Sequence, residues 1–320
     1  MGSFLCYTIS MKNTHIEHPE DSILTGDLSV LDWFVAKSNI SAKIDGSPAI
    51  VWGTNPATGN FFVGTKSVFN KKLIKINESH EDINKNHGHN AKVANILHSC
   101  LNNLPLIGSG IYQGDFIGFG GSDNYTPNTI TYYFDEVIDA KIIIAPHTYY
   151  EAKDDLRNAI SHPISDKELI TLWQDAATKD VCFLRPYVTL IDDRETIIDS
   201  CNFARQIATL CDFVDDKKAS RIKKQLNKCI RNEVELDDLI LDAIADDNNC
   251  DINVLRLWKL VESIKLELFE YIDRYDDIDC YIGESMCDHE GYVISNEFGT
   301  YKVVNREVFS FFNFTMEKTW

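Results

Sequence analysis

The sequence predicts an α+β fold in which a β-rich core is interrupted by helices and completed by a final set of strands. Residues 1–150 consist mainly of short apolar, β-branched runs separated by turns rich in Gly, Pro and Asn. From 151 to 278, apolar residues recur at three- and four-residue spacing, which is typical of amphipathic helices. From 279 to 320 the alternating strand pattern returns. We therefore expect a core from the first and last ranges, with a mainly helical insertion between them.

The first range is predicted to hold a hairpin, a helix and further strands. The apolar run 41–52 is broken by Asp45-Gly46-Ser47-Pro48, and a turn at 55–59 leads into a second strand. Residues 92–104 have the periodicity of a helix. The predicted strands after the first run cover 60–65, 109–119, 129–137 and 140–145.

The second range is predicted to hold several helices with acidic outer faces, and the third range three strands. The helical repeats include Leu169, Leu172 and Trp173, then Phe203 to Cys211, then Leu255 to Leu268. A strand over 181–191 interrupts them. The predicted strands of the last range cover 281–282, 291–294 and 301–304.

Composition and charge limit the possible functions. The chain has 320 residues, 44% of them hydrophobic, which excludes disorder, collagen and coiled coil. Its net charge of −18 would repel a polyanion if it were uniform. Residues 1–150 carry 10 lysines against 14 acidic residues, however, so most of the excess lies in the second half. The acidity therefore does not exclude a polynucleotide partner.

Targeting and cysteine patterns point to a cytoplasmic protein. The nine cysteines never form C-x-x-C, so we expect reduced thiols rather than a zinc ribbon or a disulfide framework. The amino terminus lacks the pattern of a signal peptide, and no run of 18 apolar residues occurs. We therefore expect no membrane partner.

Lys43-Ile44-Asp45-Gly46 lies where a hydrophobic strand runs into a turn. A lysine in such a place has a partly desolvated amine, which lowers its pKa and favours nucleophilic attack. Further along the chain come Gln113-Gly114-Asp115-Phe116, the aromatic run Tyr132-Tyr133-Phe134, Glu290-Gly291-Tyr292-Val293-Ile294 and Tyr301-Lys302-Val303-Val304.

This ordered set resembles motifs I, III, IIIa, IV and V of the covalent nucleotidyltransferases, the superfamily of ATP-dependent RNA and DNA ligases and mRNA-capping enzymes. The context of Lys43 is most similar to phage-encoded RNA-ligase-like proteins. The resemblance implies a twisted antiparallel-sheet nucleotidyltransferase core of the ATP-grasp-like ligase adenylation type. Eighteen residues follow Lys302, so no C-terminal OB-fold is expected. That absence is commonest among RNA ligases.

The resemblance implies the following reaction residues. Lys43 would take AMP from ATP to form lysyl-AMP, and Lys302 would bind the α-phosphate. Glu290 would hold Mg²⁺ or Mn²⁺, and Asp115 would contact the ribose or a metal-bound water. In-line attack needs a neutral amine, a metal to neutralise the triphosphate and a lysine to hold developing charge, which this set provides.

The resemblance also implies contacts to the nucleotide. Asp45 and Gly46 would shape the pocket at the ribose and phosphate, and Lys66 would contact phosphate or nucleic acid. Tyr133 or Phe134 would stack on the base, and strand alternation slightly favours Tyr133.

Other functions stay open at this stage. RNA is the preferred acceptor and DNA is possible, so the transfer step could instead seal DNA nicks. Guanylylation of RNA ends or AMP transfer to a protein would use the same core. Because Thr300 stands where motif V usually has its first lysine, a catalytically silent nucleotide-binding module is a further alternative. In that case the acidic helical insertion would dock a protein partner.

Two other groups of residues need interpretation. The pairs His87/His89 and His15/His18 lack the partner spacing of a metal site, and we interpret the first as part of a surface turn. Residues 217–231 contain seven cations. They could contact RNA or could balance acidic neighbours on a helix, and the sequence favours neither.

Overall fold

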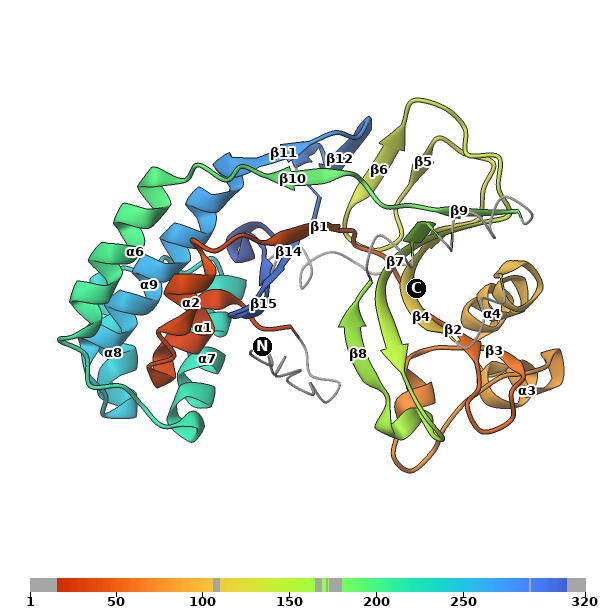
Figure 1. Ribbon diagram of the computed structural model, residues 1–320, viewed down its shortest axis with the longest axis horizontal. Helices are drawn as coiled ribbons and strands as arrows, with labels where there is room; N and C mark the ends of the chain where they lie inside the picture. Colours follow the sequence, from red (N-terminus) through yellow and green to blue (C-terminus); the bar gives the residue numbers. More distant parts are fainter. Residues whose placement is uncertain are drawn as a thin grey trace, which may run out of the picture. The chain divides into compact units, whose positions relative to one another are not determined.

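The computed structural model describes residues 16–105, 110–164, 169–170, 172, 180–287 and 289–309 (Figure 1). Contacts divide the described chain into two compact units. Unit 1 comprises residues 45–185, and unit 2 comprises residues 16–44 and 186–309. Both contain helices and mainly antiparallel sheets, so the predicted α+β class is confirmed. None of the described helices has the length and apolar character needed to cross a bilayer.

Unit 1 is built on a mainly antiparallel sheet with the strand order β3-β2-β4-β7-β8, to which β9 adds by parallel pairing with β7. These strands are β2 (Ala49–Thr54), β3 (Phe61–Gly64), β4 (Ile111–Gly118), β7 (Ile142–Glu151), β8 (Ile160–Pro163) and β9 (Val181–Phe183). The hairpin of β5 (Asn124–Tyr125) and β6 (Thr131–Phe134) follows β4. The helical elements are α3 (His80–His87), α4 (Ala91–Asn103), η2 (Lys66–Phe69) and η3 (Leu156–Asn158).

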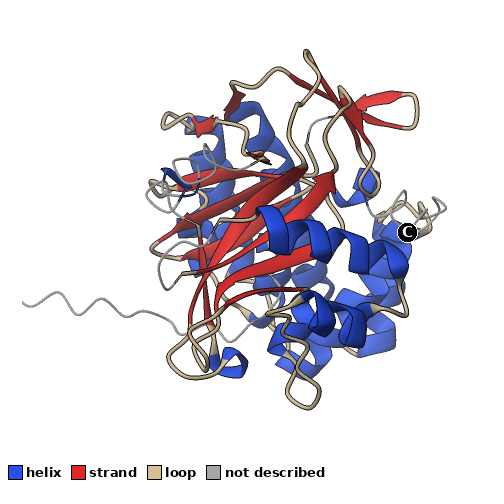
Figure 2. Cartoon of the chain, turned by 90° about the vertical axis from the view of Figure 1, so that its right-hand side faces the viewer, coloured by secondary structure: helices blue, strands red, loops and turns tan. Residues whose placement is uncertain are grey.

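Strand alternation gives this sheet two apolar faces. On one face, Ile50 and Trp52 of β2 pack with Ile83 of α3 and Leu97 of α4, and Figure 2 shows helices lying across the strands. On the other face, Val51 belongs to a smaller cluster with residues of η2 and η3. Packed side chains cover both faces of the sheet, so the register of its strands is fixed. The positions of the residues at the strand ends are fixed with it.

Unit 2 combines helices with short sheets. Its helical elements are α1 (Pro19–Ser22), η1 (Ile23–Thr25), α2 (Ser29–Trp33), α6 (Glu195–Ala208), α7 (Asp216–Arg231), α8 (Asp238–Asn248), α9 (Ile252–Glu267) and η4 (Leu268–Tyr271). Its strands are β1 (Asn39–Lys43), β10 (Val188–Leu190), β11 (Ile272–Arg274), β12 (Ile278–Ile282), β13 (Ser285–Cys287), β14 (Gly291–Asn296) and β15 (Gly299–Val303). β1, β14 and β15 form a three-stranded antiparallel sheet in the order β1-β14-β15, and β10 pairs with β11.

Aspartate side chains start the last three helices of unit 2. Asp215, Asp237 and Asp251 each accept a hydrogen bond from a backbone N–H in the first turn of α7, α8 and α9. Such caps satisfy orphan donors and are typically worth about 1 kcal/mol each. Part of the acidity of this range therefore serves to begin helices.

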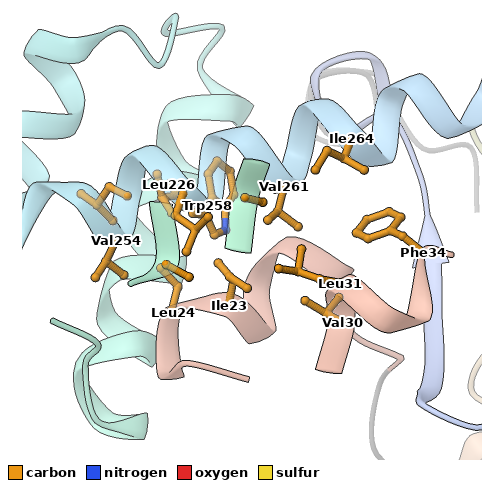
Figure 3. Close-up of a cluster of buried hydrophobic side chains, with 14 of the residues drawn as sticks. Ile23, Leu24, Val30, Leu31, Phe34, Leu226, Val254, Trp258, Val261 and Ile264 are labelled. Carbon is orange, nitrogen blue, oxygen red and sulfur yellow. The ribbon is translucent and has the colours of Figure 1, made fainter. Parts of the chain in front are cut away.

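One core joins the helices to both ends of the chain in unit 2. Ile23, Leu24 and Leu31 near the amino terminus pack with Trp258 and Val261 of α9 (Figure 3). The same cluster includes Tyr292, Ile294 and Val303 of the three-stranded sheet. Since full burial of such a side chain is worth about 1.5–3 kcal/mol, this cluster holds the helices and the sheet together.

A buried network of charges lies within the same unit. The Glu20 carboxylate accepts hydrogen bonds from Lys265 at 2.5 Å and from Arg306, and Arg306 also bonds Asp21 at 2.8 Å. Asp21 accepts a further hydrogen bond from the indole N–H of Trp258, at 3.1 Å. The network ties the amino-terminal segment to α9 and to the residues after β15.

The structure groups the chain differently from the predicted ranges 1–150, 151–278 and 279–320. Helices α6 to α9 share the core that holds β1, β14 and β15, so they belong to one body with the first and last strands. The single strand predicted over 181–191 is instead two strands, β9 in unit 1 and β10 in unit 2. The strand predicted over 140–145 continues to Glu151, because β8 pairs with its second half.

Other expectations fare as follows. The strands predicted at 60–65, 109–119 and 291–294 and the helix at 92–104 are confirmed. The predicted surface turn is confirmed at Gly88 and His89, which are exposed turn residues, but His87 is the last residue of α3 and is buried. The helix expected around Leu169 to Trp173 lies largely outside the described residues. The cysteines of the described ranges are free thiols.

Gly291→Ala should destabilise unit 2 by more than about 2 kcal/mol in urea unfolding. Gly291 has φ of +142°, and an added Cβ would lie 2.2 Å from the carbonyl oxygen of Val303. Backbone cannot move aside cheaply, so β14 and β15 would separate. The matched control is Gly59→Ala, where φ is +77° but no atom lies within 4 Å of the added carbon. It should cost about 1 kcal/mol, and equal costs for the two variants would contradict the steric argument.

Candidate functional site

The three segments that resemble motifs I, IV and V lie in neighbouring strands of one sheet. In β1 and β14, Lys43 is opposite Gly291 and Ser41 is opposite Val293, and Val293 is in turn opposite Lys302 of β15. Residues of the other parity, such as Tyr292, point into the helical core. Lys43 and Lys302 therefore project from one face of the sheet, the face turned away from the helical core.

Glu290 stands at the start of the central strand and forms an ion pair with Lys43. The Lys43 side chain is 31% exposed and the Glu290 side chain 16%, so the pair is reachable from solvent. We call Lys43, Glu290 and Lys302 the lysine cluster. Its three members come from positions 43, 290 and 302, and folding of unit 2 brings them together.

Positive charge gathers around the lysine cluster. Burial, followed by the nearby charges of Lys43 and Arg306, lowers the pKa of Lys302. His18 experiences the same field, and burial together with the charges of Arg306 and Lys302 lowers its pKa, which favours the neutral imidazole. A cluster of cations in which neighbouring positive charges lower the pKa of Lys302 favours binding of an anion.

The residue before Glu290 is anchored on both ring nitrogens. His289 is fully buried, with Nε2 at 3.2 Å from an Asp276 oxygen and Nδ1 at 3.3 Å from the Cys280 sulfur. Burial alone would raise the pKa of Asp276, but hydrogen bonds from His289 and Arg274 outweigh it and lower the pKa. This anchor fixes the chain immediately before Glu290.

Asp45 holds a loop of unit 1. Its carboxylate accepts hydrogen bonds from Asn128 Nδ2 and from the backbone N–H of Thr129, both at 2.8 Å. Its own backbone N–H donates to the hydroxyl of Tyr132 at 2.6 Å. Asp45 is 7% exposed, so within unit 1 it positions the segment that leads into β6.

Gly46 passes close to Asp115. An added Cβ on Gly46 would lie 2.8 Å from Cβ of Asp115, and Ser47 donates its backbone N–H to the carbonyl of Phe116 at 3.0 Å. Asp115 in turn lies 3.7 Å from Nε2 of His147. We call Asp45, Gly46 and Asp115 the aspartate cluster, all of it within unit 1.

The remaining predicted residues of unit 1 lie at its surface. Lys66 is exposed and follows β3, at the end of the sheet where Ala49 is opposite Asp115. Tyr133 is 46% exposed, whereas Phe134 is partly buried with its ring edge-on to Tyr125. The preference for Tyr133 over Phe134 as the stacking residue stays a prediction.

Tyr132→Phe should lower the free energy of unfolding by about 1–3 kcal/mol, because it leaves the buried N–H of Asp45 without its 2.6 Å acceptor. Tyr133→Phe removes the same hydroxyl from the neighbouring, exposed residue and should cost less than about 0.5 kcal/mol. Urea unfolding of the two variants provides the comparison. Equal effects would mean that the hydroxyl of Tyr132 does not support Asp45.

Among the described residues, no group of three or more His, Cys, Asp or Glu side chains could hold a metal ion. Magnesium is commonly bound by one or two carboxylates together with substrate phosphates. Glu290, as one partly exposed carboxylate beside two lysines, fits that kind of site.

Several residues that support the two clusters were not predicted. Tyr132 was named only as part of the aromatic run, without a role of its own. Strand alternation already implies that its side chain points to the other face of the strand from that of Tyr133. His289 is adjacent to Glu290 in the sequence, but nothing there indicates its partners Asp276 and Cys280. Arg306 and the neutral state of His18 depend on tertiary packing.

Comparison with known proteins places the chain in a family. The profile of a family of unknown function, DUF6267, matches residues 13–240 and 235–318. The chain belongs to that family. No curated protein matches it, and no solved structure matches it.

Proposed function

We propose that the protein is an ATP-dependent polynucleotide ligase that acts through a lysyl-AMP intermediate on Lys43, with RNA as the favoured substrate. The observation that carries the proposal is the lysine cluster. Three segments that resemble motifs I, IV and V form adjacent strands, with both lysines on one face and Glu290 paired to Lys43. Nothing in the order of the motifs along the chain requires this convergence.

The first step uses Lys43 as the nucleophile. Its amine attacks the α-phosphorus of ATP, a phosphorus–nitrogen bond forms, the bond to the β-phosphate oxygen breaks, and pyrophosphate leaves. Lys43 forms an ion pair with Glu290, so its ammonium group releases a proton to solvent before the amine attacks. Lys302, on the same face, would hold the charge that develops on the α-phosphate.

The residues around Lys43 are also compatible with a bound divalent cation. Glu290 and triphosphate oxygens would hold Mg²⁺ or Mn²⁺, which supplies neutralisation of the triphosphate charge. The charge of Arg306 also acts on Lys302, since it contributes to lowering the pKa of that lysine.

The aspartate cluster supplies the nucleotide contacts in this proposal. Only Ile44 separates Lys43 from Asp45, so the chain keeps their Cα atoms within about 7 Å. Asp115 and Gly46 would line the ribose, Lys66 would contact phosphate or nucleic acid, and the exposed ring of Tyr133 would stack on the base.

Two transfers complete the reaction. A 5′-phosphate oxygen attacks the phosphorus of lysyl-AMP, which restores the Lys43 amine. A 3′-hydroxyl then attacks that 5′-phosphate, and AMP leaves as the phosphodiester forms. Incubation with α-labelled ATP and Mg²⁺ or Mn²⁺ tests the first step, and nicked RNA, nicked DNA and single strands distinguish the acceptors. A wild-type protein that never becomes labelled would overturn the proposal.

A further inference from the structure

Helix α7 carries a row of exposed cations along one face. Lys217, Arg221, Lys224 and Lys228 follow one another at intervals of four, three and four residues, and all four are exposed. At about 100° per residue they lie within an arc of about 60° and extend over about 16 Å of the helix axis. We call these four residues the α7 stripe.

The rest of α7 faces elsewhere. Ala219, Ile222, Leu226 and Ile230 are buried in the core of unit 2, on the side of the helix opposite the stripe. Two other cations of the helix have partners, because Lys218 donates to the carbonyl of Asn249 at 3.0 Å and Lys223 lies 3.4 Å from a Glu17 oxygen. The stripe is thus distinct from the cations that hold α7 in place.

Stability of the helix does not explain the stripe. Among the described carboxylates, none forms an ion pair with any of the four residues. Cations favour the last turn of a helix through its dipole, which accounts for Lys228, but Lys217 lies in the first turn, where the dipole disfavours a cation. Residues 217–232 contain no acidic residue at all, in a chain with a net charge of −18.

We propose that the α7 stripe binds the phosphodiester backbone of the polynucleotide substrate. The inference rests on the proposed function for the identity of that substrate and adds the surface that holds it. Charge complementarity supports this occupant, since a linear row of Lys and Arg along a helix is the electrostatic footprint of a nucleic-acid-binding surface. Because the net charge of the chain is −18, most of the remaining surface would repel a polyanion, whereas the α7 stripe and the lysine cluster would attract it.

The test compares two variants with the same change in charge. The stripe variant is K217Q/R221Q/K224Q/K228Q. The control variant, K37Q/K85Q/K153Q/R256Q, also removes three lysines and one arginine, all exposed and outside α7. Fluorescence anisotropy of a labelled 5′-phosphorylated single-stranded RNA, measured over a range of salt concentrations, gives the affinity of each protein.

The wild-type protein should bind RNA with an affinity that falls steeply with salt. Each single-strand phosphate contact contributes about −0.7 to the slope of log K against log salt, so loss of four contacts should reduce the slope by about 3. The ratio of the RNA-binding constant of the wild type to that of the stripe variant should therefore fall about fifty-fold between about 50 and 200 mM salt. The control variant should keep the wild-type slope.

Three results would overturn the inference. The first is a stripe variant that binds RNA like the wild type, and the second is an equal loss of RNA affinity in the stripe and control variants. The third is displacement of RNA by polyglutamate of equal charge, which would indicate an acidic protein partner. Covalent labelling by ATP separates this inference from the proposed function. The stripe variant should still become labelled, whereas stripe-dependent RNA binding by a protein that never becomes labelled would refute the ligase alone.

Discussion

Lys43→Ala is expected to abolish covalent labelling of the protein by α-labelled ATP. Removal of the nucleophile from an enzyme that works through a covalent intermediate costs about 10⁶-fold in kcat, so the signal should fall to background. The label should be found in a peptide that contains Lys43 and should require Mg²⁺ or Mn²⁺. Mass spectrometry of the labelled protein locates it.

Two controls separate loss of chemistry from loss of structure. Lys43→Arg keeps a cation beside Glu290, whose side chain is 16% exposed, and should unfold like the wild type while also failing to label. Lys37→Ala changes an exposed lysine just before β1 and should label normally. Labelling of Lys43→Ala itself would show that another residue is the nucleophile. Stronger labelling with GTP than with ATP would favour a guanylyl transferase.

The largest effect on stability is expected for Glu20→Gln. This substitution leaves Lys265, which is fully buried, and Arg306, which is 3% exposed, without a main counter-charge. Breaking a buried ion pair from one side costs about 3–5 kcal/mol, because the remaining charge stays desolvated. Urea unfolding at pH 7 gives the difference in free energy.

The pH dependence of that difference has a definite sign. Burial alone would raise the pKa of Glu20, but the charges of Lys265 and Arg306 outweigh it and lower the pKa. A carboxyl with a lowered pKa stabilises the fold above its unfolded pKa of about 4.3, and this contribution is lost as the pH falls through the folded value. The penalty of Glu20→Gln should therefore be largest near neutrality and shrink in acid.

An exposed ion pair in the same unit provides the control. Asp238 and Arg256 lie 3.4 Å apart, with side chains that are 73% and 48% exposed. Asp238→Asn should change stability by less than about 1 kcal/mol, as surface pairs do. A similar cost for both substitutions would mean that burial does not set the strength of the Glu20 network.

Many helices and strands could be predicted from the sequence, because the spacing of apolar residues matches the elements that form in the structure. The strand at 291–294 and the helix at 92–104 form where their patterns place them. The grouping of elements was not predictable in the same way. The pattern of α9 reveals an apolar face, but not that Ile23 and Leu31, more than two hundred residues earlier, would cover it.

The lysine cluster illustrates the same division. Residue types at Lys43, Glu290 and Lys302 were sufficient to name candidates, because each stands in a short motif. The common face of Lys43 and Lys302 follows from the β1-β14-β15 register, which no local pattern specifies. The hydrogen bonds that hold His289 come from Asp276 and Cys280, which lie 13 and 9 residues earlier in the sequence, and no local pattern predicts them.

Ile44 marks the last residue of unit 2 before the chain enters unit 1, and Pro186 marks its return. Residues 45–185 are thus one unbroken segment nested inside the sequence of the other unit. A segment of this kind can be gained, lost or replaced without cutting the β1-β14-β15 sheet, since β1 lies before the segment and β14 and β15 lie after it. The proposed nucleophile and the residues proposed to recognise the nucleotide can therefore diverge at separate rates, although Lys43, Asp45 and Gly46 stand within four consecutive residues.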